Sequence, residues 1–184
     1  GFTRHLLQCR YAVGCHAFVC TGAGKKSPFS SRLVHGLDAP CAVNTEWFSP
    51  GGTGGPELVL FYAGRQGPEA CAPAVTEFLK MRGRCHAAVL CEGRATWEGW
   101  KKAHGTMPHG ERLHLPGTLS LEQYRDLLRA ASLLVCLPGN TLPAATLLEA
   151  MSSGVAPVLE QGTGPAFLRA GKNAFFFPGK GTEA

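Results

Sequence analysis

Residues able to do chemistry gather in the stretch from Tyr124 to Lys180. A helix in this stretch carries one carboxylate, Glu149, in the setting LLEAM, and a glycine-rich loop at Gly162, Thr163 and Gly164 follows the next apolar run. Strand–loop–helix units place such loops and helix N-termini at one edge of a parallel sheet, where anionic ligands are usually held. The stretch therefore predicts an anion-binding edge.

The elements that position this edge are read from apolar runs and helical periodicity. Strands are predicted at residues 17–20, 58–63, 86–90, 112–115, 132–137, 155–159 and 174–177, and helices at 68–82, 96–104, from 120 onward, at 143–153 and at 165–170. Ser120 and Gln123 have the form of a capping box. Strands that alternate with helices indicate a parallel sheet with right-handed crossovers, and unbroken apolar strands indicate that both sheet faces are covered. We predict an α/β fold, a Rossmann-like doubly wound parallel sheet.

The domain organisation is marked by one connector rich in glycine and proline. Residues 51–56 are predicted to be a linker. A lead-in segment, residues 1–50, precedes it as the remnant of a preceding domain, and the sheet domain is expected at 57–184.

The amino-acid composition excludes several classes of protein. The chain is 45% hydrophobic and 17% charged, which excludes disorder, and no apolar run reaches the roughly 18 to 20 residues of a membrane span. A net charge of +5 is dispersed and is not interleaved with aromatic residues, so no nucleic-acid partner is expected. We expect a soluble domain, and an organelle or a membrane-associated assembly stays open as its location.

The cysteine spacing and the absence of common catalytic motifs limit the kinds of metal, cofactor and catalytic site that we expect. The eight cysteines include no Cys-x-x-Cys pair, so we interpret them as core or incidental thiols, with no metal and no cofactor. A zinc site is the less favoured alternative; its ligands would come from His5, Cys9, Cys15, His16 and Cys20. The dinucleotide fingerprint, the Walker loop and the G-x-S-x-G elbow are all absent from the sequence.

Four pieces in the same order carry a family resemblance over residues 17–180. They are CAVNTEWFSP (41–50), LVLFYAGR (58–65), ERLHLPGTLSLEQYRDLLRAASLLVCLPG (111–139) and LLEAMSSGVAPVLEQGTGPAFLRAGKNAFFFPG (147–179). Together they resemble the C-terminal, donor-binding domain of retaining GT-B glycosyltransferases of the group 1 type. Parts of residues 120–160 also resemble exostosins, which share the GT-B architecture.

This resemblance implies a nucleotide-diphosphate sugar, such as a UDP- or GDP-sugar, as the ligand. By position, Arg65 matches the family's phosphate-binding arginine, and Glu149 matches the glutamate that contacts the ribose. The loop of Gly162, Thr163 and Gly164 matches the loop near the sugar and the diphosphate. The implied fold is the C-terminal half of a GT-B enzyme.

Two departures leave activity open. The family's second diphosphate cation, a lysine, falls on Ala70, and the first glutamate of its acidic pair falls near Thr141. The alternative function is a catalytically degenerate glycosyltransferase-like protein that acts as a structural or interaction subunit of a larger assembly. A GT-B enzyme also needs an N-terminal acceptor domain, so we expect either a piece of a longer enzyme or a stand-alone descendant.

Overall fold

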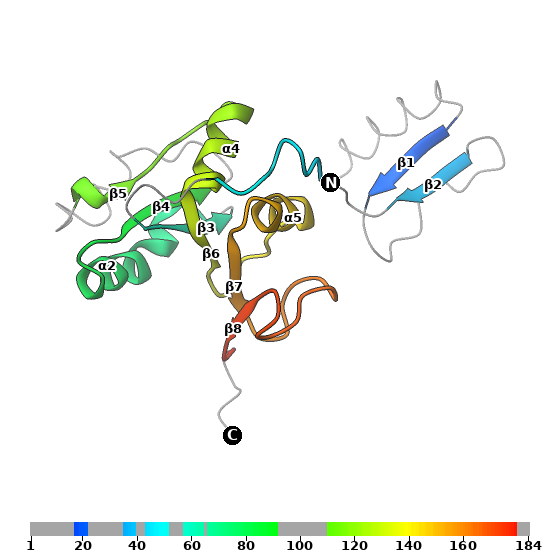
Figure 1. Ribbon diagram of the computed structural model, residues 1–184. Helices are drawn as coiled ribbons and strands as arrows, with labels where there is room; N and C mark the ends of the chain where they lie inside the picture. Colours follow the sequence, from blue (N-terminus) through cyan, green and yellow to red (C-terminus); the bar gives the residue numbers. More distant parts are fainter. Residues whose placement is uncertain are drawn as a thin grey trace. The chain divides into compact units, whose positions relative to one another are not determined.

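The computed structural model describes residues 17–21, 35–39, 43–51, 57–64, 66–91 and 110–179 (Figure 1). The chain divides into two compact units, Gly1–Ala42 and Val43–Ala184. In the first unit, β1 (Ala17–Thr21) and β2 (His35–Ala39) pair in parallel, so the strand expected at 17–20 is confirmed. The linker expected at 51–56 and the helix expected at 96–104 stay predictions, because residues 52–56 and 92–109 lie outside the described part.

The second unit contains a six-stranded parallel sheet in the order β5-β4-β3-β6-β7-β8. The strands are β3 (Leu58–Gly64), β4 (His86–Cys91), β5 (Leu113–His114), β6 (Ala131–Cys136), β7 (Ala156–Glu160) and β8 (Phe175–Phe177). Every residue of the central strand β3 is buried. The prediction of an α/β, Rossmann-like parallel sheet is confirmed.

Helices cover both faces of this sheet (Figure 1). They are the 3-10 turn η1 (Pro68–Cys71), α2 (Ala72–Met81), the 3-10 turn η2 (Gly110–Arg112), α4 (Leu121–Ala130) and α5 (Ala144–Ser152). Helix α2 packs through Val75 and Leu79 in a core with Phe61, whereas α4 and α5 pack through Leu128 and Leu147 in the core of the other face. The predicted capping box opens α4: the Gln123 amide donates to Ser120 Oγ at 3.2 Å, and the Ser120 amide donates to Gln123 Oε1 at 2.9 Å.

The order of the strands fixes where a ligand edge should lie. From β3 the chain passes through α2 to β4 on one side, and from β6 it passes through α5 to β7 on the other side. The direction of winding therefore reverses between the neighbouring strands β3 and β6. Ligands of doubly wound sheets bind beyond the carboxyl ends of the strands at such a switch point.

A segment before the sheet, residues 43–51, packs against both α4 and α5, and we call it the anchor segment. Phe48 is 6% exposed and belongs to the same core as these helices, and its carbonyl accepts a hydrogen bond from Ser152 Oγ at the end of α5. Trp47 lies beneath the Arg125 guanidinium, 4.6 Å from the ring centre. Gly51 approaches α4 so closely that a Cβ there would lie 2.6 Å from the Arg129 carbonyl oxygen. The anchor segment thus ties together two helices that are far apart in sequence.

A buried arginine closes the end of α2 on the opposite face. Arg112, predicted as an ordinary strand residue, is 9% exposed. Its guanidinium donates to three carbonyl oxygens, those of Leu79 at 2.8 Å, Arg82 at 2.7 Å and Cys85 at 3.1 Å. The last carbonyls of a helix lack partners within the helix and carry its negative dipole end, so a cation there is favoured.

The short helix predicted at 165–170 is wrong, because the segment forms turns. One turn is closed by the Leu168 amide, which donates to the Pro165 carbonyl at 3.1 Å. The Asn173 side chain hydrogen-bonds to two backbone groups that would bond within the helix if the helix formed. Its Oδ1 accepts from the Arg169 amide at 2.7 Å, and its Nδ2 donates to the Phe167 carbonyl at 3.0 Å. Asparagine side chains compete with helix bonding in this way.

Two histidines join β4 to the edge strand β5. His86 Nδ1 and His114 Nε2 lie 2.9 Å apart, with the rings 8° from parallel and their centres 5.2 Å apart. The distance between the two nitrogens is shorter than the spacing between the faces of stacked rings. One imidazole therefore donates a hydrogen bond to the other. Burial, and then the neighbouring His86, lower the pKa of His114 below its ordinary value.

This histidine pair predicts a pH dependence of stability. The unfolded chain binds a proton at His114 at a higher pH than the folded chain does, so the free energy of unfolding should fall as the pH drops through about 6.5. We expect His114→Gln to lose less stability than the wild type between about pH 7.5 and pH 5.5. Urea unfolding at the two pH values measures this, and an equal loss in both proteins would contradict the assignment.

Candidate functional site

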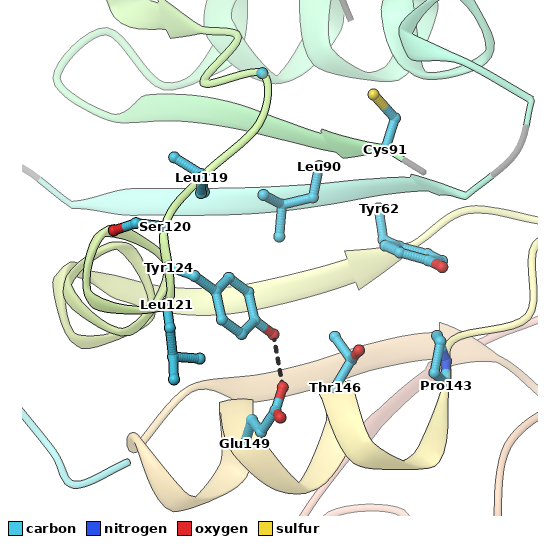
Figure 2. Close-up of a pocket in the computed structure, with 11 residues that line it drawn as sticks. Tyr62, Leu90, Cys91, Leu119, Ser120, Leu121, Tyr124, Pro143, Thr146 and Glu149 are labelled. Carbon is cyan, nitrogen blue, oxygen red and sulfur yellow. Dashed lines mark hydrogen bonds between the residues drawn. The ribbon is translucent and has the colours of Figure 1, made fainter. Parts of the chain in front are cut away.

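A pocket with a volume of about 430 Å³ lies on the face of the sheet that carries α4 and α5 (Figure 2). Its floor comes from the carboxyl ends of β3 and β4, through Tyr62, Leu90 and Cys91. Its walls come from the residues that lead into α4, from α4 itself and from the first turns of α5. The volume falls in the range of ligand pockets, roughly 300 to 1,000 Å³.

Glu149 and Tyr124 face each other across this pocket. Tyr124 extends from α4 and Glu149 from α5, and the phenol hydroxyl donates to Glu149 Oε2 at 3.1 Å (Figure 2). Among the described residues, no donor hydrogen-bonds to the other carboxylate oxygen, Oε1. The bond crosses 25 positions of the sequence and joins the two helices of this face.

Burial controls the ionisation of both groups. It raises the pKa of Glu149, and the hydrogen bond from Tyr124 opposes that rise. Burial likewise raises the pKa of the Tyr124 hydroxyl, and the negative Glu149 raises it further. The tyrosine therefore stays protonated at neutral pH and acts as a donor to the carboxylate.

Aromatic packing fixes the position of the tyrosine ring. Phe48 of the anchor segment meets the Tyr124 ring edge to face, with ring centres 6.1 Å apart and an angle of 72° between the planes. Such edge-to-face pairs are favourable beyond the area that they bury. The tyrosine is thus held by its own helix, by the anchor segment and by the carboxylate of α5.

Backbone turns bring the ends of β3 and β6 close together beside the pocket. Gly64 ends β3 with a φ of 56°, and a Cβ there would lie 2.8 Å from Asn140 Oδ1. Gln66 Nε2 donates to the Gly139 carbonyl at 3.2 Å, which links the two loops. Asn140 Nδ2 is buried and has no hydrogen-bond partner within the described part of the chain. Glycine at residue 64 has no Cβ to block this close approach. It also adopts a positive φ that residues with a side chain rarely adopt.

The first turn of α5 opens at the same edge of the sheet. Pro143 is the N-cap residue, and no side chain caps the amides of this helix. Helix N-termini of this kind attract negative charge through unpaired N–H groups and the helix dipole.

The structure describes four of the five residues that the sequence predicted as one site. Glu149 lines the pocket, whereas Gly162, Thr163 and Gly164 form a turn after β7 and are not among its lining residues. In that turn the Thr163 amide and Thr163 Oγ1 both donate to the Glu160 carbonyl, at 3.0 Å and 2.6 Å. Arg65 lies outside the described residues.

The two positions of departure are both at the surface. Ala70 lies in η1 and is exposed, and Thr141 is exposed in the loop between β6 and α5. Neither side chain supplies a charge at the positions where the resemblance would place one.

Sequence reasoning missed the hydrogen bond between Tyr124 and Glu149. One signal could have found it. A tyrosine on a buried face needs a partner for its hydroxyl, and Glu149 in an apolar helix needs a donor. One hydrogen bond between the two side chains satisfies both, once α4 and α5 lie on the same face of the sheet.

Two of the described cysteines are kept in the thiol form by burial. Burial raises the pKa of Cys71 to about 12 and also raises the pKa of Cys136, so both thiols remain protonated. Within the described ranges, no group of three or more histidine, cysteine, aspartate or glutamate side chains is placed to hold a metal ion. No helix in the same ranges is long and apolar enough to cross a membrane.

Comparison with known proteins identifies the architecture. No protein-family model and no curated protein matches the sequence. The C-terminal domain of LpcC, a glycosyl transferase group 1 family protein from Francisella tularensis, matches with a TM-score of 0.54 at 20% identity, over 76% of this chain and 81% of that one. The fold is that of a GT-B glycosyltransferase C-terminal domain.

The structure of TarM matches over most of the chain. The TM-score is 0.60 at 15% identity, and the match covers 96% of this chain but 36% of the TarM chain. At such identities the likeness shows the fold alone. The resemblance to GT-B C-terminal domains that the sequence predicted is therefore confirmed at the level of the fold.

Proposed function

We propose that this chain is a glycosyltransferase-type domain that binds a nucleotide-diphosphate sugar, a UDP- or GDP-sugar, for glycosyl transfer. The observation that carries the proposal is the place of Glu149. This carboxylate lines the pocket on the α4 and α5 face, with apolar side chains around it and one oxygen not used by the described residues. Apolar walls with a few fixed polar groups are typical of nucleotide and other small-ligand sites.

In this proposal each part of the ligand has a partner. Glu149 Oε1 accepts hydrogen bonds from the ribose hydroxyls, and the nucleobase lies against Leu90 and Leu119. The diphosphate is held at the edge of the sheet by Arg65 and by the uncapped first turn of α5, with the loop of Gly162, Thr163 and Gly164 beside the sugar. The support for this part is the sequence resemblance together with the position of α5.

A second function is favoured by Ala70 and Thr141. Without a lysine at residue 70, stabilisation of the leaving diphosphate would rest on Arg65 and the helix N-terminus, and without a carboxylate near residue 141 the transferred sugar would lack its acidic contact. Loss of one such contact commonly costs about 3 kcal/mol of transition-state stabilisation. The alternative is a non-catalytic descendant that serves as a structural or interaction subunit for other proteins.

Calorimetric titration of the full chain with UDP, GDP and inorganic pyrophosphate tests the proposal. We expect one nucleotide to bind, and pyrophosphate to bind at least about tenfold more weakly, because it lacks the ribose and base that the pocket contacts. Absence of nucleotide binding at millimolar concentration would refute it. Binding of UDP-sugars or GDP-sugars without any release of the nucleoside diphosphate, with or without an added sugar acceptor, would favour the non-catalytic alternative.

A further inference from the structure

We propose that Tyr124 is a positioning residue for Glu149: it occupies one carboxylate oxygen and turns the other toward the bound nucleotide. This inference rests on the proposed function, because it specifies how the same pocket presents its acceptor. It assigns a role in binding to a residue that would otherwise count as part of the packing of α4.

The first support is the geometry of the pair. The Tyr124 hydroxyl donates to Oε2 of Glu149 at 3.1 Å, and no described residue hydrogen-bonds to Oε1. Figure 2 shows the two side chains meeting inside the pocket, with Thr146 on the same helix as Glu149. A hydrogen bond to one oxygen restricts the rotamers of the carboxylate, so the direction of its other oxygen is partly set before any ligand arrives. Such preorganisation reduces the entropy that binding must overcome.

The second support is that Tyr124 cannot easily turn away. Its ring packs edge to face on Phe48, which is 6% exposed and whose carbonyl accepts from Ser152 Oγ at the end of α5. Three elements therefore hold the phenol: α4 carries it, the anchor segment packs against its ring, and α5 carries the carboxylate that accepts its hydrogen bond.

The third support is chemical. Burial raises the pKa of Glu149, which works against the charged form that accepts hydrogen bonds from ribose hydroxyls. The hydrogen bond from Tyr124 favours the charged form and so opposes burial. The tyrosine remains a donor throughout, because its own pKa is raised by burial and by the adjacent carboxylate.

The test compares four forms of the full chain: the wild type, Tyr124→Phe, Glu149→Gln and the double variant. Phenylalanine keeps the ring that packs on Phe48 and removes only the hydroxyl. Calorimetry with UDP and with GDP is carried out between about pH 5 and pH 8, and the Glu149 carboxyl is titrated by NMR in the nucleotide-free protein.

We expect Tyr124→Phe to weaken nucleotide binding about 3- to 10-fold at pH 7, the range for one net hydrogen bond. The loss should grow toward pH 5, because the pKa of Glu149 rises when the donor is removed. In the Glu149→Gln background, Tyr124→Phe should reduce the nucleotide affinity only slightly. Glutamine does not change its charge with pH, and this background has already lost the ribose contact.

Three outcomes would overturn the inference, and each is distinct. If the wild type binds neither nucleotide, the proposed function fails and this role fails with it. If the wild type binds but Tyr124→Phe binds equally well, with an unchanged Glu149 titration, only the positioning role fails. If the loss is just as large in the Glu149→Gln background, the tyrosine acts through packing and not through the carboxylate.

Discussion

Replacing Glu149 by glutamine is expected to lower the affinity for the nucleotide about 10- to 100-fold while leaving the protein at least as stable as the wild type. The affinity falls because hydrogen bonds to a charged acceptor are worth about 1.5 to 3 kcal/mol, and glutamine presents a neutral oxygen and an amide in its place. The loss should be the largest caused by any single change within the described pocket, since Glu149 is the one acidic residue in its lining.

The stability of this variant follows from the direction of the pKa shift. Burial raises the pKa of Glu149 in the folded chain, so ionisation costs more there than in the unfolded chain. That cost is present at pH 7 and disappears as the pH falls below about 4. We expect Glu149→Gln to stabilise the fold at pH 7 by less than about 1 kcal/mol, because solvent screens a carboxylate that is only partly buried.

Calorimetry with UDP and GDP and thermal unfolding at pH 7 and pH 4 measure the two effects. The matched control is Glu77→Gln on α2, on the other face of the sheet, where the side chain is exposed and pairs with Lys80 at 2.8 Å. It removes the same charge and should bind nucleotide as the wild type does. Equal affinities in the wild type and Glu149→Gln would remove Glu149 from the site.

Replacing Arg112 by methionine is expected to destabilise the fold by about 2 to 4 kcal/mol. Methionine keeps much of the apolar stem, but it removes the donor of the Leu79 and Cys85 carbonyls and leaves the Arg82 carbonyl only the Cys85 amide, at 3.2 Å. Two of these carbonyls lie at the end of α2, where the guanidinium also meets the negative end of the helix dipole. Lysine should restore only part of the stability, because an ammonium cannot reach three acceptors with a planar fork.

Chemical denaturation of the full chain measures this loss as a lower midpoint with a similar slope. Arg84→Met provides the control, since Arg84 is exposed in the turn between α2 and β4. The same change in charge there should alter stability by no more than about 0.5 kcal/mol. A midpoint for Arg112→Met that matched the control would mean that water replaces the guanidinium without cost.

The sheet is predictable from sequence because its strands are buried on both faces. Leu58–Gly64 is a continuous apolar run, and an all-parallel sheet with covered faces is the architecture in which such runs occur. The capping box at Ser120 is predictable for a local reason, since both of its bonds lie within four residues. Local chemistry and burial therefore account for the observed order of strands and helices.

The site is less predictable because its bonds are long-range. Tyr124 and Glu149 are 25 positions apart, and Arg112 donates to carbonyls that precede it by 27 to 33 positions. Neither partnership leaves a periodic signal in the sequence. The error at residues 165–170 has another cause, since Asn173 lies beyond the predicted helix and yet captures its backbone groups.

The anchor segment also determines where the folded unit can be cut. Phe48 belongs to the core of the second unit, and that unit begins at Val43, ahead of the glycine-rich connector. A chain shortened at the connector would lose Phe48 and expose the apolar surface of α4 and α5 that it covers, next to the ring of Tyr124. Isolating the second unit for crystallisation or NMR therefore calls for a first residue at or before 43, although the sheet itself begins at Leu58.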